Sequence, residues 1–494
     1  MDTKADSPTA MSKLQATIWF WSVVLAYATI WVLIPSTLHT GYRGDVIEML
    51  TVGHQWVWSA KNHPSLPGWI AEILNVLTCR SFAVPFIATQ LCTILTLWSV
   101  WQLGRIVLDE RLALLGAFSV LPYSFFAIKP VWYNHNNVLI AFWCLSIYLV
   151  FQALHTNKKR YWIGAGIALG LGFHAKYPVI LLVVSILAYM FTRQEGRRYF
   201  RTLGPYLTTV VAFAIFLPHI IWLFYHDFPT LSHLTKLPSV PRWFALLHFT
   251  GGQLLYLILT LIVVTPIIGL AWNWKIQRYE QCAAKECEKF LFYCFMIPLV
   301  CHLLFCGIKG VELIMAYGAA FWGFFGLWLL LRFQKTVTPQ HWKLAVTLPI
   351  TMVLLIAIGF TLLFYSGNKN PNLSRPSKEL GTTCEQLWHS RFPDVNCPYI
   401  SGDDFILTAH VAHFMPVRPI VIMGWGTWAS NDDLNQKGGM IVWERDDDEN
   451  NLPESLRQRF PNAEVLPEAP DLPYKVGRET RMLKIGIAIV PPSP

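Results

Sequence analysis

The chain has 494 residues, of which 54% are hydrophobic and 14% are charged, and it carries a formal net charge of +9. Apolar runs of roughly 18 to 24 residues recur along most of it, and in hydrocarbon only helices satisfy every backbone polar group within each run. This composition excludes a soluble globular protein and predicts a polytopic α-helical membrane protein. The basic residues lie between the apolar runs, so membrane topology explains the charge better than nucleic-acid binding does.

Eleven membrane spans are expected in the first 366 residues. The first run lacks a small-residue cleavage site, which makes it an uncleaved span and not a signal peptide. The fifth and sixth runs are short and only three residues apart, so the exact number of spans depends on this pair. The expected spans are residues 16–38, 82–106, 112–129, 136–154, 161–174, 178–192, 203–225, 250–273, 288–307, 311–331 and 344–366.

The loops between these spans differ in their content of lysine and arginine. Those on the side of the N-terminus carry eighteen, and the short loops on the other side carry eight. Because cytoplasmic loops are enriched in basic residues, the N-terminus is expected in the cytoplasm of a bacterial inner membrane. The first loop, residues 39–81, and the C-terminus beyond the eleventh span would then face the periplasm.

A polar segment at residues 366–379 separates the predicted transmembrane domain, residues 1–366, from residues 367–494, where no run is long enough to span a bilayer. Residues 418–424, 439–444 and 483–490 have the apolar pattern of short strands, and residues 401–414 that of a capped helix. We therefore expect a small periplasmic α/β domain. Cys384 and Cys397 lie in it, and on the oxidising side of the membrane they are expected to form a disulfide.

The first loop gathers polar side chains just after the first span. Asp45 and Glu48 are three residues apart, which places both carboxylates on one face if the segment is helical. Two interpretations remain open at this point: an active-site segment, or an interfacial helix whose acids keep it soluble. Lys61 and His63 follow in a proline-rich turn, where they could hold a phosphate or reach toward lipid headgroups.

Three further polar clusters are expected on the same side of the membrane. Residues 133–137, Tyr-Asn-His-Asn-Asn, open the fourth span, where they could bind an anion or simply cap the helix. Lys176, with Tyr177, lies between two short spans, and a lysine so close to hydrocarbon is costly unless it meets an anion or snorkels. His226 follows the seventh span and fits a cavity or a surface loop. The shared sidedness of all four clusters favours one extracytoplasmic site.

Several of these segments resemble those of a known protein family. Asp45-x-x-Glu48 followed by the His63-Pro-Ser-Leu-Pro-Gly-Trp turn resembles the first periplasmic loop of bacterial family 39 glycosyltransferases. These are GT-C enzymes, a group that includes the lipid A aminoarabinose transferase and the protein O-mannosyltransferases. YNHNNVLIAFW at residues 133–143 and LGLGFHAKYPVILL at residues 169–182 are similar to further segments of that family. The resemblance covers roughly residues 15–230.

The resemblance implies transfer of a hexosyl- or pentosyl-type sugar from a polyprenyl-phosphate carrier, with inversion, to a lipopolysaccharide, another surface glycan or a protein. Asp45 would be the general base, with Glu48 beside it, and Lys176 would hold the donor phosphate with His63 and Lys61. The residues expected to bind substrate are Tyr133, Asn134, His135, Asn136, Tyr177 and His226.

Two positions depart from the family pattern. Many members have adjacent acids where this chain has Asp45 and Val46, and many have an aspartate where it has Asn136. An amide is a poor metal ligand and cannot act as a base. A divalent metal therefore remains only a possible cofactor, and no metal site is assigned. The competing function is a transporter or flippase of lipid-linked substrates, but a transporter needs access from both faces, and the ionisable residues here collect on one.

Overall fold

The computed structural model describes residues 11–59, 62–226, 228, 230, 238–268, 282–333, 339–367, 370–422, 429–445, 451–469 and 471–492. Contacts divide the chain into two compact units. We call the first, Met1–Val32, Thr89–Val131 and His135–Ile358, the helical unit, and the second, Leu33–Ala88, Trp132–Asn134 and Gly359–Pro494, the mixed unit. The domain boundary expected after residue 366 stays a prediction.

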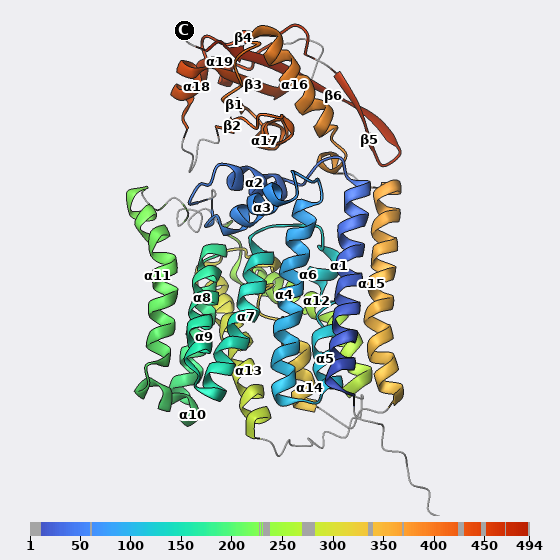
Figure 1. Cartoon of the computed structure of the whole chain (residues 1–494), viewed down its shortest axis with the longest axis vertical. Coiled ribbons are helices and arrows are strands. Elements are labelled where there is room, and N and C mark those ends of the chain that lie inside the picture. Colours follow the sequence, from blue (N-terminus) through green and yellow to red (C-terminus); the bar gives the residue numbers. More distant parts are fainter. Residues whose placement is uncertain are drawn as a thin grey trace, which may run out of the picture. The chain divides into compact units, whose positions relative to one another are not determined.

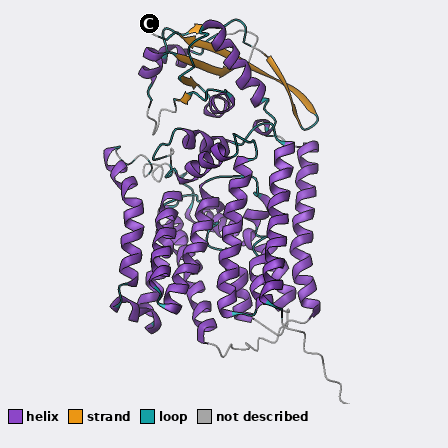
Figure 2. Ribbon diagram, in the orientation of Figure 1, coloured by secondary structure: helices purple, strands orange, loops and turns teal. Residues whose placement is uncertain are grey.

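The helical unit is built mainly from long helices (Figures 1 and 2). α8 packs against both α7 and α11, and α9 packs against α13. Its elements are α1 (Lys13–Leu38), α4 (Val84–Val107), α5 (Glu110–Phe118), α6 (Ser124–Ile128), α7 (His135–Thr156), α8 (Lys159–Ala175), α9 (Val179–Thr192), α10 (Gln194–Arg197), η1 (Arg198–Arg201), α11 (Gly204–Tyr225), α12 (Arg242–Ile268), α13 (Cys282–Lys309), η3 (Met315–Gly318), α14 (Phe325–Phe333) and α15 (Pro339–Gly367). The last residues of α1 and α15 and the first of α4 belong to the mixed unit.

Among the described residues, seven helices are long and apolar enough to cross a membrane, or eight if the bent pair Val179–Thr192 and Gln194–Arg201 counts as one span. The expected number of eleven is not confirmed. The span expected at 112–129 is broken into α5 and α6, because Pro122 lies between them and has no backbone N–H for a continuous helix. The span expected at 311–331 is likewise split into η3 and α14.

The mixed unit holds the strands, drawn in orange in Figure 2, together with shorter helices. In its described residues the strands form one six-stranded sheet of order β2-β1-β3-β6-β4, with β5 paired to β6. β1 is parallel to β2 and β3, whereas β6 is antiparallel to β3, β4 and β5. The elements are α2 (Gly44–His54), α3 (Leu66–Leu77), η4 (Pro371–Leu373), α16 (Ser377–Arg391), β1 (Tyr399–Gly402), α17 (Phe405–Phe414), β2 (Ile420–Val421), α18 (Asn431–Lys437), β3 (Gly439–Glu444), α19 (Glu454–Arg459), β4 (Glu464–Val465), β5 (Asp471–Val476) and β6 (Glu479–Val490).

Helices cover both faces of the sheet. Alternate residues of β3 point to opposite sides, and both sets of side chains are buried. Met440 and Val442 pack in one apolar cluster with residues of α16 and α17, and Ile441 and Trp443 pack in another with residues of α18 and α19. The strands expected at 439–444 and 483–490 and the capped helix within 401–414 are present, and Asp404 caps that helix by accepting from the backbone of Ile406 and Leu407.

The prediction of a disulfide between Cys384 and Cys397 is wrong, because both are free thiols. Both side chains are buried in the cluster beneath α16 and α17, where a small apolar residue fits without a covalent bond. The Cys397 thiol donates to the carbonyl of Tyr399 at 3.3 Å, and burial raises its pKa. The two cysteines are therefore part of the apolar core.

Candidate active site

Asp45 lies in the first turn of α2, where the helix dipole favours a carboxylate. The helix expected over Asp45 and Glu48 is present, and Val46, Met49 and Leu50 on its other faces are buried. Asp45 is exposed and Glu48 is half-buried. The side-chain amide of Asn134 donates to Oδ2 of Asp45 at 3.2 Å. One carboxylate oxygen is therefore oriented by the protein while the side chain remains accessible.

Residues 132–134 connect Asp45 to the rest of the first loop. The hydroxyl of Tyr133 donates to the carbonyl of Pro67, at the start of α3, at 2.7 Å. The guanidinium of Arg43 lies 3.6 Å above the ring of Trp132, a cation–π contact. Tyr133 and Asn134, expected to bind substrate, thus have a visible structural role in joining α2 and α3.

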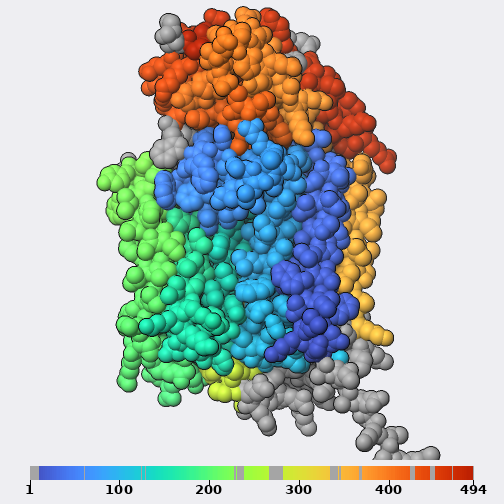
Figure 3. All heavy atoms as spheres, in the orientation of Figure 1, coloured from blue at the N-terminus to red at the C-terminus, as the bar shows by residue number. Residues whose placement is uncertain are grey.

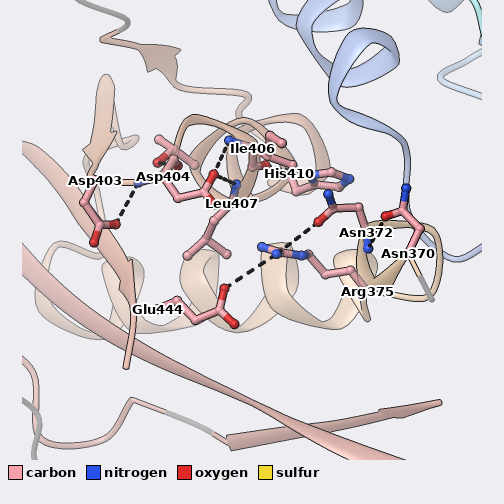
Figure 4. A network of polar contacts seen from close by, with 10 residues as sticks. Asn370, Asn372, Arg375, Asp403, Asp404, Ile406, Leu407, His410 and Glu444 are labelled. Carbon is pink, nitrogen blue, oxygen red and sulfur yellow. Dashed lines mark hydrogen bonds and ion pairs between the residues drawn. The ribbon is translucent and has the colours of Figure 1, made fainter. Parts of the chain in front are cut away.

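The start of α2 is fixed by α17. The backbone N–H of Tyr42 donates to Nε2 of His410 at 3.0 Å, and Nδ1 of His410 donates to the carbonyl of Ile406 at 2.6 Å. Burial, with Arg375 nearby, lowers the pKa of His410 to about 3, so the ring is neutral and Nε2 can accept. Figure 4 shows His410 beside Arg375, which reaches Glu444 at 3.7 Å and Asn372 at 3.2 Å.

The end of α2 is fixed by a buried ion pair. The two terminal guanidinium nitrogens of Arg418 donate to the carboxylate of Glu72 at 2.8 Å, and both side chains are about 5% exposed. His54, the last residue of α2, bonds through Nε2 to the carbonyl of Arg418 at 2.9 Å. Although burial raises the pKa of Glu72, hydrogen bonds from His54 and Arg418 bring it down to about 2. Figure 3 shows the continuous surface that α2 and α3, in blue, form with the orange and red C-terminal residues.

Lys176 is the central residue of the polar cluster in the helical unit. It follows α8 directly in an extended conformation, at the break before α9, and only 5% of it is exposed. Its Nζ donates to Oδ1 of Asn136, in the first turn of α7, at 2.9 Å. The ring of Tyr317 lies 4.8 Å from Nζ. The structure therefore brings two of the expected site residues together around a buried cation.

The other expected residues have different surroundings. The hydroxyl of Tyr177 bonds to Nε2 of His219 at 2.8 Å and to the hydroxyl of Thr230 at 2.7 Å. His226 is exposed at the end of α11, stacks on Trp222 and bonds to its carbonyl at 2.8 Å. His135 begins α7 and is buried, and His63 is half-buried in the turn before α3. Lys61 lies outside the described residues.

Sequence patterns did not indicate most of the residues that hold these side chains and helices in place. Glu72 carried the one available signal, a lone acid inside the apolar helix LPGWIAEILNVL. Arg418, His410 and Tyr317 had none, because their partners are distant in sequence. In the described part of the chain, no group of three or more His, Cys, Asp or Glu side chains could hold a metal ion.

Comparisons with known proteins bear on the family resemblance and on the fold. Residues 62–222 match the model of a family described as dolichyl-phosphate-mannose-protein mannosyltransferase, a segment that includes the clusters at 133–137 and around Lys176. The structure is similar to that of ArnT from Cupriavidus metallidurans bound to undecaprenyl phosphate, with a TM-score of 0.60 over 98% of this chain and 100% of that chain, at 11% sequence identity. The chain therefore has the GT-C fold. The resemblance found in the sequence and the multi-pass membrane architecture are confirmed.

The apo form of the same ArnT matches this GT-C fold with a TM-score of 0.55, at 12% identity over 97% of this chain and 99% of that one. The archaeal oligosaccharyltransferase AglB from Archaeoglobus fulgidus, in complex with an inhibitory peptide and a dolichol-phosphate, has a TM-score of 0.46, at 12% identity over 88% of this chain and 70% of that one. No curated protein sequence matches the chain.

Proposed function

We propose that this protein is a membrane glycosyltransferase that moves a hexosyl- or pentosyl-type sugar from a polyprenyl-phosphate donor to a lipopolysaccharide, surface glycan or protein acceptor. The observation that carries the proposal is Asp45: an exposed carboxylate with one oxygen held by Asn134, on a helix fixed at both ends, in a chain with the GT-C fold. Such a group is accessible to an acceptor and rigid enough to orient it.

Asp45 is the general base in this proposal. Its carboxylate takes the proton from an acceptor hydroxyl as that oxygen attacks the anomeric carbon of the sugar. The bond between the anomeric carbon and the phosphate oxygen breaks with inversion, and polyprenyl phosphate leaves. Because Asp45 is exposed, the proton it has accepted returns to solvent. Glu48 is a second carboxylate on the same helix and supports this step.

Lys176 holds the donor phosphate. Its ammonium neutralises the negative charge that grows on the leaving phosphate as the glycosidic bond breaks. Asn136 fixes the direction of Nζ, and the ring of Tyr317 provides an aromatic face for the cation. We assign supporting contacts with substrate to His63, Lys61, Tyr133, Asn134, His135, Tyr177 and His226.

We place the enzyme in a bacterial inner membrane, with its N-terminus in the cytoplasm and Asp45 and the C-terminus in the periplasm. The excess of basic residues in the loops on the side of the N-terminus supports this orientation. The polyprenyl-phosphate donor carries its own leaving group, so no step of the reaction is assigned to a metal, and treatment with EDTA is expected to leave the transfer rate unchanged. A chelator-sensitive rate that Mg²⁺ restores would require a metal in the mechanism.

Mass spectrometry of surface glycolipids and glycoproteins from a strain that lacks this protein tests the function. We expect one sugar to be missing from one class of acceptor, and the missing mass identifies both. A flippase would leave the acceptor chemistry to another enzyme, so purified protein would not form product from donor and acceptor. Unchanged glycans in the deletion strain would contradict the proposal.

A further inference from the structure

A cavity of about 510 Å³ lies within the mixed unit. Its walls include Leu38, at the end of α1, and Phe364, near the end of α15. Both helices are among those long and apolar enough to cross a membrane. The cavity is therefore lined by residues at the level where two candidate spans end, and we call it the helix-end cavity.

One part of the wall of the helix-end cavity is rich in groups that attract an anion. Ser377 and Lys378 in the first turn of α16 line it, and this helix has no side-chain N-cap. The backbone N–H groups and the dipole at such a helix start favour negative charge. Lys475 of β5 lines the same cavity, and Glu379 is the acid on its wall. Two lysines against one glutamate leave a net positive charge.

The rest of the wall is apolar and aromatic, with Phe82 and Phe364 beside Leu38. His39 also lines the cavity. It is 5% exposed, its ring packs against Phe364 at 5.3 Å, and its buried Nε2 has no hydrogen-bond partner among the described residues. A buried polar nitrogen without a partner is costly, and a polar atom of a ligand would relieve that cost.

These features together describe an amphipathic cavity, cationic on one side and apolar on the other, at the ends of two spans. We infer that the helix-end cavity binds the phosphate headgroup of an anionic membrane phospholipid, with Lys378, Lys475 and the start of α16 around the phosphate and Phe82 and Phe364 beside the glycerol and first acyl carbons. This lipid is distinct from the sugar donor. It would anchor the C-terminal domain to the bilayer surface.

Native mass spectrometry on the full-length protein tests this inference. The protein is reconstituted in nanodiscs that contain equal amounts of phosphatidylglycerol and phosphatidylcholine, and the lipid retained after release is counted. We expect the wild-type protein to retain phosphatidylglycerol preferentially. The double variant Lys378→Gln, Lys475→Gln should reduce that retention by about fivefold for each lysine, as for basic residues at an anionic membrane surface.

Two controls keep the result interpretable. Lys437→Gln removes an exposed lysine of α18 in the same unit and should not change lipid retention. Asp45→Asn should retain lipid as the wild type does, so a failure of the proposed transfer reaction is distinguishable from a failure of this inference. Equal retention of the two lipids by the wild type, or equal retention by the double variant, would overturn it. Displacement by inorganic phosphate at the concentration of the lipid would show a site for a free anion instead.

Discussion

Asp45 and Lys176 are both charged groups proposed to act in one reaction, but their surroundings differ. Asp45 is exposed, and its helix is fixed by residues from the far end of the chain, His410 and Arg418. Lys176 is buried and is held by Asn136 and Tyr317 at the break between two helices. A general base must reach an acceptor and return its proton to water, whereas a phosphate-binding cation gains strength where water is excluded.

Asp45 and Lys176 are also held in position by different kinds of contact. The position of α2 depends on hydrogen bonds to His410 and Arg418 of the same unit, so mutations far from Asp45 in sequence are expected to change transfer. The position of Lys176 depends on the local geometry of α7 and α8.

Replacing the base should have the largest effect. Asp45→Asn keeps the shape of the side chain and its contact with Asn134, but it cannot accept a proton, so the transfer rate should fall about 10²- to 10⁴-fold. The assay is restoration of the missing sugar in the deletion strain, measured by mass spectrometry. Asp432→Asn, an exposed carboxylate of the same unit, should restore it fully. Full restoration by Asp45→Asn would show that Asp45 is not the general base.

Breaking the buried ion pair should be next. Glu72→Gln leaves the guanidinium of Arg418 buried opposite a neutral amide, which should destabilise the mixed unit by about 3 to 5 kcal/mol. Hydrogen exchange of the backbone at residues 44–77 should increase, and transfer should fall with it. Arg481→Ala removes an exposed pair with Glu479 and should cost less than about 1 kcal/mol. Equal effects of the two variants would show that the pair does not position α2.

Lys176→Gln removes the cation proposed to hold the donor phosphate. Hydrogen bonds to charged groups contribute about 1.5 to 3 kcal/mol, so the KM for the donor should rise about 10- to 100-fold. Lys309→Gln, at the exposed end of α13, is the matched control and should leave KM unchanged. Because the same cation is proposed to stabilise the leaving phosphate, kcat should fall as well. An unchanged kcat/KM for the donor would contradict the assignment of Lys176.

His410 should make the stability of the mixed unit depend on pH. Its pKa is lowered from 6.5 to about 3 by burial and by Arg375, so the unfolded chain binds more protons between these values. The stabilisation from its neutral ring is complete above about pH 6.5 and is lost as the pH falls toward 3, by up to about 1.4 kcal/mol per pH unit. Thermal unfolding of His410→Gln between pH 6.5 and 4 should show a shallower dependence, and an unchanged slope would contradict it.

Much of the candidate site could be predicted because its signals are local. The spacing of Asp45 and Glu48 predicted the helix and its buried face. The polar residues at the start of α7 and at the α8–α9 break pointed to Asn136 and Lys176 separately, and the hydrogen bond between them was not predicted. The alternation of apolar residues likewise located β3 and β6. Each of these features depends on residues that are close together in the sequence.

The remaining features depend on contacts between distant parts of the chain. Glu72 and Arg418 are 346 positions apart, and Tyr42 and His410 are 368 apart, so no periodicity connects them. The number of spans is not confirmed for a different reason: hydropathy does not register the break that Pro122 introduces between α5 and α6. The cysteine pair failed because spacing alone does not separate a disulfide from core packing.

The most direct test of the account is the release of polyprenyl phosphate by the purified protein. Wild-type protein and Asp45→Asn are reconstituted in nanodiscs with a synthetic polyprenyl-phosphate sugar and an extract of the acceptor identified in the deletion strain, and free polyprenyl phosphate is measured by mass spectrometry over time. We expect acceptor-dependent release by the wild type and almost none by Asp45→Asn, with the variant still folded. Equal release by both proteins, or none by the wild type, would contradict it.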